Sequence, residues 1–296
     1  MCIFTFLLII FVPATGKIDA NTRIMTKCHL FFLTASVLLL FSCKPSQESP
    51  SLSDYGAKSQ ATQRLLFEKY VLELLDQSPE RAWQMQDSLL ESAACDSARW
   101  QQLTALEEHF LLDPNSPYRN EELYIPVVEH LLASPFTSEK QRTYAAWIRP
   151  RLQLNRPGQK AGDFEFVTPK GRRTSLFATI DAHRPQQTLL FFSNPDCDNC
   201  KEIADALSRN PAVRKKLHAA ALLIVNIYPD EDVQTWLGHL HDYPEEWICG
   251  YDADQRLNSG TLYWLRAIPS LYLLDSEKRV ILKDATLERI LSALSY

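Results

Sequence analysis

Residues 188–200 read T-L-L-F-F-S-N-P-D-C-D-N-C, an apolar run followed by a polar break and two closely spaced cysteines. The continuous apolar run from Leu189 to Phe192 is typical of a strand that is buried on both faces. Residues 193–196 break this strand, and the residues after Cys200 have helical spacing. The pattern therefore predicts a strand-to-helix turn that carries Cys197 and Cys200.

A C-x-x-C at such a turn places the first sulfur at the N-terminus of a helix. The unpaired amides and the helix dipole there favour a thiolate over a thiol. The spacing brings both sulfurs into one helical turn, so the pair can cycle between dithiol and disulfide, and we interpret it as a redox site. Half of a zinc site, a static disulfide and a chance pair of buried thiols are the alternatives. Structural zinc needs four ligands, and no second C-x-x-C occurs, so neither a metal nor a cofactor is expected.

The composition is that of a globular protein. The chain has 296 residues, of which 46% are hydrophobic and 23% charged, enough for one large or two ordinary domains. A net charge of -5, without a basic stripe of interleaved aromatics, argues against nucleic acid as a partner.

The N-terminal part of the chain resembles an export signal. After Met25 come Lys27, a short apolar segment over residues 30–41, and then Leu40-Phe41-Ser42-Cys43. This length fits a secretory signal and is short for a membrane span. Leu-x-Ser-Cys resembles the bacterial lipobox, which implies lipidation of Cys43; an ordinary signal peptide or an uncleaved anchor is the alternative. We therefore expect a leader over residues 1–43, with Met25 as a candidate true start, and a flexible tether over residues 44–59.

Residues 60–155 have helical periodicity. We expect helices over the ranges 79–93, 97–112, 121–132 and 138–152 after a first helix from residue 60, with a break at residues 113–117. Trp83, Trp100 and Trp147 are predicted to anchor the helical core. No catalytic constellation occurs here, so this part is predicted to be a scaffold or a partner-docking domain.

Residues 156–296 alternate between strand and helix patterns. The predicted strands cover residues 163–167, 188–192, 221–228, 247–251, 270–274 and 279–283. Helices are expected near 175–182, from the C-x-x-C to about 219 with an interruption at 210–211, over 231–241, over 254–263 and from 286 onward. Such βα units followed by a hairpin and a terminal helix predict an α/β domain with a mixed sheet flanked by helices, preceded by an all-α domain.

This order, with Ala267-Ile268-Pro269-Ser270 some seventy residues after the motif, resembles the thioredoxin fold. The resemblance implies that Pro269 follows a cis peptide bond and lies against the two sulfurs, and that the backbone of Ile268 contacts substrate. The start Ala161-Gly162-Asp163-Phe164 is similar to the opening of the TlpA/ResA branch of thiol–disulfide oxidoreductases. The helical part resembles modules that precede such domains in Bacteroidetes lipoproteins.

Three features depart from the family pattern. Thioredoxin has a buried acid six residues before its first cysteine, where this chain has Phe191. The TlpA/ResA branch often has a glutamate shortly after the second cysteine, but Glu202 comes one position early and is expected to face solvent. The usual tryptophan before the motif is also absent. These departures bear on the direction and strength of the redox couple.

By the family geometry, Cys197 is the nucleophile and Cys200 resolves the mixed disulfide. Pro195, Asp196 and Asp198 flank the nucleophile and are expected to modulate it. The negative charge of the two aspartates opposes the helix dipole, which favours a reductant over a strong oxidant. Turn formation and helix capping are the simpler roles for both.

The sequence predicts a membrane-anchored extracytoplasmic thiol–disulfide oxidoreductase, held by a lipid on Cys43 in the outer membrane and facing the periplasm. Its partners would be a protein disulfide or dithiol substrate and a membrane electron donor. The alternatives are a non-catalytic binding lipoprotein with a structural disulfide and a peroxidase. Peroxidases usually carry a threonine three residues before the reactive cysteine, and this chain has Asn194 at that position. Cys95 and Cys249 are expected to be buried free thiols, with a structural pair or a second relay as alternatives.

Overall fold

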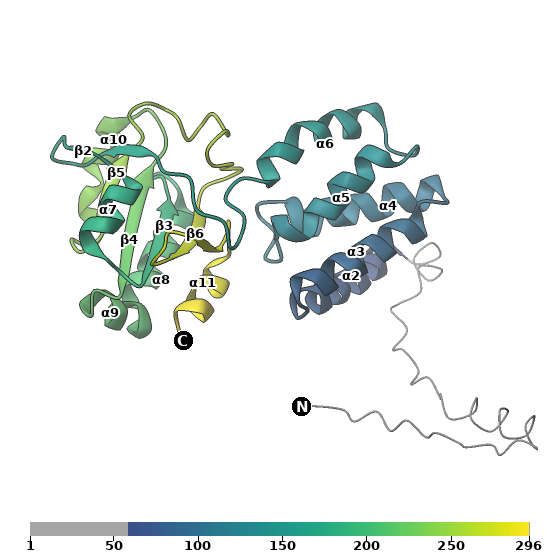
Figure 1. Ribbon diagram of the computed structural model, residues 1–296, viewed down its shortest axis with the longest axis horizontal. Coiled ribbons are helices and arrows are strands. Elements are labelled where there is room, and N and C mark those ends of the chain that lie inside the picture. Colours follow the sequence, from purple (N-terminus) through teal and green to yellow (C-terminus); the bar gives the residue numbers. More distant parts are fainter. Residues whose placement is uncertain (1–58, 296) are drawn as a thin grey trace, which may run out of the picture. The chain divides into compact units, whose positions relative to one another are not determined.

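The computed structural model describes residues 59–295 (Figure 1), which all belong to one compact unit. The expected leader, Cys43 and nearly all of the expected tether lie outside the described residues. Among the helices of the described part, none is long and apolar enough to cross a membrane.

Residues 60–152, here called the helical region, form helices close to the predicted ranges. The helices are α2 (Gln60–Leu75), α3 (Pro79–Ala93), α4 (Ser97–Glu107), α5 (Glu121–Ala133) and α6 (Glu139–Leu152). Each begins after a short polar residue whose side chain accepts a backbone N–H of the first turn. The predicted helix over 97–112 changes at Glu108 into a π-helical turn, Glu108–Leu112.

The tryptophans of the helical region have three different surroundings. Trp100 is fully buried in its core, as predicted, and Trp83 is half-buried against the same core. Trp147 is 49% exposed, so its prediction as a core anchor was wrong. The buried face of α6 is formed by Ala145, Ile148 and Leu152, and residue 147 lies off that stripe.

Residues 158–295, here called the sheet region, form a seven-stranded mixed sheet in the order β2-β1-β5-β4-β3-β6-β7. The strands are β1 (Glu165–Val167), β2 (Arg173–Ser175), β3 (Gln187–Phe192), β4 (Leu222–Tyr228), β5 (Ile248–Tyr251), β6 (Ser270–Asp275) and β7 (Val280–Leu282). Strands β3, β4 and β5 are parallel, whereas β6 is antiparallel to β3, and β1 to β5. The predicted fold class is confirmed.

Helices cover both faces of this sheet. The helices are α7 (Leu176–His183), α8 (Asp198–Arg209), α9 (Pro211–His218), α10 (Val233–Gly238) and α11 (Leu287–Leu294). Buried side chains of α8, α9 and α11 share one core with Phe191 and Leu271, whereas α7 packs into the core that contains Phe192 and Tyr272. Alternate residues of β3 thus point into two separate cores, which is why its run is apolar throughout.

The predicted helix over 254–263 is not present. Instead, the carboxylate of Asp252 accepts the N–H of Leu257 at 2.7 Å, and the amide of Asn258 donates to the carbonyl of Pro229 at 2.8 Å. Gln255 and Gly260 have positive φ values of 54° and 64°, which a right-handed helix does not allow. The side chains of this segment therefore replace helical hydrogen bonds with turns.

Candidate active site

The two cysteines lie where β3 gives way to α8. Cys197 is the N-cap of α8, and its Sγ accepts the backbone N–H of Cys200 at 3.2 Å. The sulfur thus occupies the place that a serine or aspartate oxygen takes at other helix starts. The predicted position of the first sulfur at a helix N-terminus is confirmed.

Asn194 shapes the turn between strand and helix. Its Oδ1 accepts the N–H of Asp196 at 2.8 Å, and its backbone carbonyl accepts the N–H of Cys197 at 3.1 Å. Its Nδ2 donates to Asp230, just beyond β4, at 2.6 Å. Pro195 is buried inside this turn. The side chain of Asn194 therefore ties the motif to the neighbouring parallel strand.

Cys200 lies deeper than Cys197. Cys200 is 1% exposed and packs with Phe191 and Leu207, whereas Cys197 is half-buried at the edge of the same core. Burial, followed by its interaction with Cys197, raises the pKa of the Cys200 thiol. Both residues are free thiols. This is the asymmetry that a nucleophile and a resolving thiol require.

Ile268 and Pro269 lie beside the first cysteine. Their peptide bond is cis, as the family resemblance implied. Ser270, the next residue, pairs with Phe192 at the end of β3, so the antiparallel pairing of β6 brings this segment to the motif. The thiol of Cys197 donates to the carbonyl of Ile268 over 3.7 Å. The role of both residues in binding substrate remains a prediction.

The predicted modulating acids point to solvent. Asp196 is exposed, and the side chain of Asp198 is 95% exposed, 3.8 Å from the ammonium group of Lys201. Glu202 is exposed, as expected. Phe191, at the position of the thioredoxin acid, is fully buried and packs edge-on against Trp247, with ring centroids 6.3 Å apart.

A buried polar cluster near the cysteines was not predicted. The hydroxyl of Ser193 donates to Oδ1 of Asn226 at 2.6 Å and lies 3.3 Å from the hydroxyl of Tyr243. Burial raises the pKa of Tyr243, and negative charge on Cys200 would raise it further. Asn226 interrupts the otherwise apolar strand β4, and this single polar residue was the signal in the sequence.

The other two cysteines of the described residues, Cys95 and Cys249, were expected to be buried free thiols. Cys249 in β5 is free and half-buried, and burial raises its pKa to about 12. Cys95 is free but exposed, so its predicted burial was wrong. It lies in the short loop between α3 and α4, where its thiol donates to the carbonyl of Ser92 over 3.6 Å.

A mixed sheet, a two-cysteine motif at the start of α8 and a cis-proline beside it define a thioredoxin-fold protein. A thioredoxin-like protein from Bacteroides caccae is similar over most of the chain: the two share 33% identity, and the match covers 83% of this chain and 88% of that one, with a TM-score of 0.74. The chain belongs to this family of thioredoxin-like proteins.

Other similarities cover only part of the chain each. Residues 54–155 match the family described as a domain of unknown function, DUF5106. The C-terminal domain of an uncharacterized protein from Bacteroides fragilis is 39% identical over 48% of this chain and 99% of that one, with a TM-score of 0.45. The thioredoxin domain of a thiol-disulfide oxidoreductase from Bacteroides vulgatus is 16% identical over 48% and 99%, with a TM-score of 0.39. No curated protein matches the chain.

Proposed function

We propose that the chain is a thiol–disulfide oxidoreductase of the TlpA/ResA type that reduces disulfides in protein substrates. The observation that carries this proposal is the place of Cys197: its sulfur caps α8 and lies 3.7 Å from the carbonyl of Ile268, beside a cis-proline. A half-buried sulfur at a helix N-terminus, with a second thiol buried one turn away, suits two-step exchange.

In the first step, the thiolate of Cys197 attacks one sulfur of the substrate disulfide. A Cys197–substrate disulfide forms, and the other substrate sulfur leaves as a thiolate that takes up a proton. In the second step, Cys200 loses its proton and attacks the sulfur of Cys197, which releases the second substrate thiol. The dithiol thereby becomes a disulfide, and two electrons pass to the substrate.

The surroundings of the motif favour a reductant. A strong oxidant stabilises its reduced form through a very stable thiolate. Here Asp196 and Asp198 place negative charge near Cys197, and Lys201 is drawn toward Asp198. The burial of Cys200 also favours its thiol over its thiolate. A membrane dithiol donor would have to restore the reduced pair after each cycle.

The test of this activity is reduction of insulin disulfides by the full-length chain with dithiothreitol as the electron source. Cys197→Ser should lose the turnover, and Cys200→Ser should accumulate a mixed disulfide with the substrate, because the resolving thiol is missing. Cys249→Ser is the matched control and should keep the turnover. If the wild-type chain shows no turnover above the Cys197→Ser variant, the proposal fails and a binding protein with a structural disulfide is favoured.

We further propose that a lipid on Cys43 anchors the chain in the outer membrane, facing the periplasm. The support is the Leu-x-Ser-Cys sequence after a short apolar segment. Growth with a labelled fatty acid should label the wild-type chain, and Cys43→Ser should lose the label and leave the membrane fraction. An unlabelled wild-type chain would contradict the anchor without affecting the redox proposal.

A further inference from the structure

The segment that leads to the cis-proline is held by the helical region. Asn155, just after α6, donates from its Nδ2 to the carbonyl of Leu262 at 2.8 Å. Trp264 is 6% exposed and belongs to the core of the helical region although it lies between β5 and β6. Arg266 follows two residues later and forms an ion pair with Glu121 of α5, at 3.1 Å. The helical region thus fixes Trp264 and Arg266, and the linker residue Asn155 fixes Leu262.

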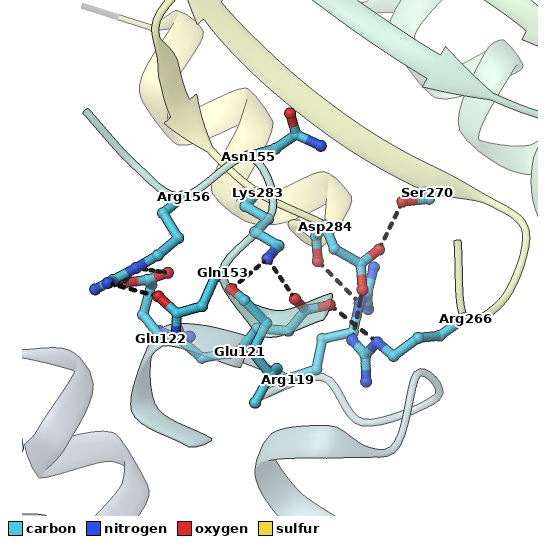
Figure 2. A network of polar contacts seen from close by, with 12 residues as sticks. Arg119, Glu121, Glu122, Gln153, Asn155, Arg156, Arg266, Ser270, Lys283 and Asp284 are labelled. Atoms are coloured by element: carbon cyan, nitrogen blue, oxygen red, sulfur yellow. Dashed lines mark hydrogen bonds and ion pairs between the residues drawn. The ribbon is translucent and has the colours of Figure 1, made fainter. Parts of the chain in front are cut away.

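Arg266 and Glu121 belong to a buried network of charges (Figure 2). The side chain of Glu121 is 2% exposed and lies between Arg266, which is 6% exposed, and Lys283, which is 2% exposed and 2.7 Å away. The ammonium group of Lys283 also donates to the carbonyl of Leu152, the last residue of α6, at 3.0 Å. The carboxylate therefore binds two cations of the sheet region at once.

Asp284 connects the network to Ser270, on the other side of the cis-proline. Its Oδ2 accepts from Arg266 at 2.5 Å, and its Oδ1 accepts the hydroxyl of Ser270 at 2.8 Å. Arg119 of the helical region donates to its backbone carbonyl at 3.1 Å. Asp284 has a φ of 41°, which lies in the left-handed region. This conformation is unfavourable for residues other than glycine. The surrounding contacts hold it in this conformation.

The network therefore binds the residues on both sides of the Ile268–Pro269 segment. Arg266 lies two residues before Ile268, and Ser270 directly follows Pro269; both bind Asp284. Between them lies the carbonyl of Ile268, which accepts the thiol of Cys197. Loss of the Glu121 charge would leave Lys283 without its carboxylate and Arg266 with Asp284 alone, so we expect the segment to rearrange.

We propose that Glu121 of the helical region is a positioning residue of the redox site, acting through Arg266 and Asp284 on the segment that faces Cys197. The helical region would then help to position the residues of the redox site. The part of this inference that concerns substrate rests on the proposed function, whereas the effect on the Cys197 thiol does not.

The experiment compares Glu121→Gln with Glu122→Gln in the full-length chain. Glu122 is the next residue of α5, and its carboxylate pairs with Arg156 at 2.8 Å, without a contact to residues 266–270. Both variants lose one carboxylate charge: that of Glu121 pairs with Arg266 and Lys283, and that of Glu122 pairs with Arg156. Their thermal midpoints, their kcat and KM for insulin reduction, and the alkylation rate of Cys197 in the reduced chain are measured.

Glu121→Gln should raise KM about tenfold and change kcat less than about twofold, since the substrate groove is displaced while the two thiols stay. The alkylation rate of Cys197 should rise about threefold, because the Ile268 carbonyl no longer holds and covers its thiol. Glu122→Gln should leave KM and the alkylation rate unchanged. A merely structural role of Glu121 would lower the thermal midpoint and leave both quantities as in Glu122→Gln.

Equal KM values and equal alkylation rates in two folded variants would overturn the inference. If Glu121→Gln does not fold, Ser270→Ala takes its place, since it removes one hydroxyl from the network and leaves every charge paired; values like those of Glu122→Gln would then overturn it. If the wild-type chain reduces no insulin, the proposed function fails, and the alkylation rates still decide the inference.

Discussion

At the scale of single residues, the two cysteines differ because their surroundings differ. Cys197 caps a helix and lies half-buried at the edge of a core, where its sulfur accepts the backbone N–H of Cys200. Cys200 is inside that core, where a charged sulfur loses hydration. Phe191 fills the position of the thioredoxin acid, and the polar groups nearby are those of Ser193, Asn226 and Tyr243.

This difference predicts the outcome of alkylation at pH 7. In the reduced full-length chain, iodoacetamide should modify Cys197 at least about tenfold faster than Cys200, because burial raises the pKa of Cys200 and leaves it protonated. Modification of Cys200 should become faster only as the pH rises toward its raised pKa. Peptide mass analysis separates the sites.

Two further cysteines serve as internal controls for that measurement. Cys95 is exposed and should be modified readily, whereas Cys249, with a pKa of about 12, should be protected like Cys200. Equal rates at Cys197 and Cys200 would contradict the assigned roles.

At the scale of elements, the sequence predicted most helices and strands of the described residues. Apolar periodicity and short polar caps were sufficient for α2 to α6 and for the central strands, because these elements follow local rules. The prediction of a helix over residues 254–263 was wrong because Asp252 and Asn258 bind distant or non-helical backbone groups. Such competition depends on tertiary contacts that no local pattern records.

The candidate site, like the fold, could be predicted in part from the sequence. The C-x-x-C and the proline after Ile268 could be identified, since their spacing along the chain is characteristic. The polar cluster around Asn226 and the ion pairs of Arg266 could not, because their partners come from elements far apart in sequence. Glu107 is another such residue: it lies on the same face of α4 as Trp100 and Leu103 and is fully buried, although a glutamate is usually exposed.

Glu107 predicts a pH dependence of stability. Its carboxyl accepts from Nε2 of Gln86 at 2.9 Å, and burial raises its pKa to about 8 from 4.5. Between these values the unfolded chain loses a proton that the folded chain keeps. The free energy of unfolding should therefore fall as the pH rises from 5 to 8, by at most about 1.4 kcal/mol per pH unit from this group.

Urea unfolding of two variants isolates this contribution. Glu107→Gln should lose the slope, and Glu108→Gln, an exposed neighbour, should keep it. A slope that is the same in both variants would show that Glu107 is ionised in the folded protein.

Strand β5 predicts a steric effect. A Cβ added at Gly250 would collide with the buried ring of Phe166, so Gly250→Ala should lower the free energy of unfolding by about 1–3 kcal/mol. Gly238 at the end of α10 has no atom within 4 Å of such a Cβ, and Gly238→Ala should leave stability nearly unchanged. Similar midpoints in chemical denaturation for the two variants would show that β1 and β5 can separate without cost.

At the scale of the whole molecule, the helical and sheet regions share a core and a charge network. Trp264 of the sheet region is buried among helical side chains. If the helical region unfolded first, Lys283 would lose the carboxylate of Glu121 and Arg266 would keep only Asp284, which is unfavourable. Residues 59–295 therefore form one structural body, as the proposed role of Glu121 requires.

We accordingly expect the two regions to unfold together. Differential scanning calorimetry of the full-length chain should give one transition for this unit, with equal calorimetric and van't Hoff enthalpies. Glu122→Gln should keep the single transition, since Lys283 and Arg266 retain their partner. Two separate transitions in the wild-type chain would contradict this coupling.

The measurement that bears most directly on the function is the redox equilibrium of Cys197 and Cys200 in the full-length chain. The chain is equilibrated in buffers of defined potential, and the disulfide is quantified by peptide mass. We expect the bond to form and break reversibly near the potential of thioredoxin, about -270 mV. A bond that stays intact down to below about -300 mV, in a chain that reduces no insulin, would contradict the assignment of a reductase.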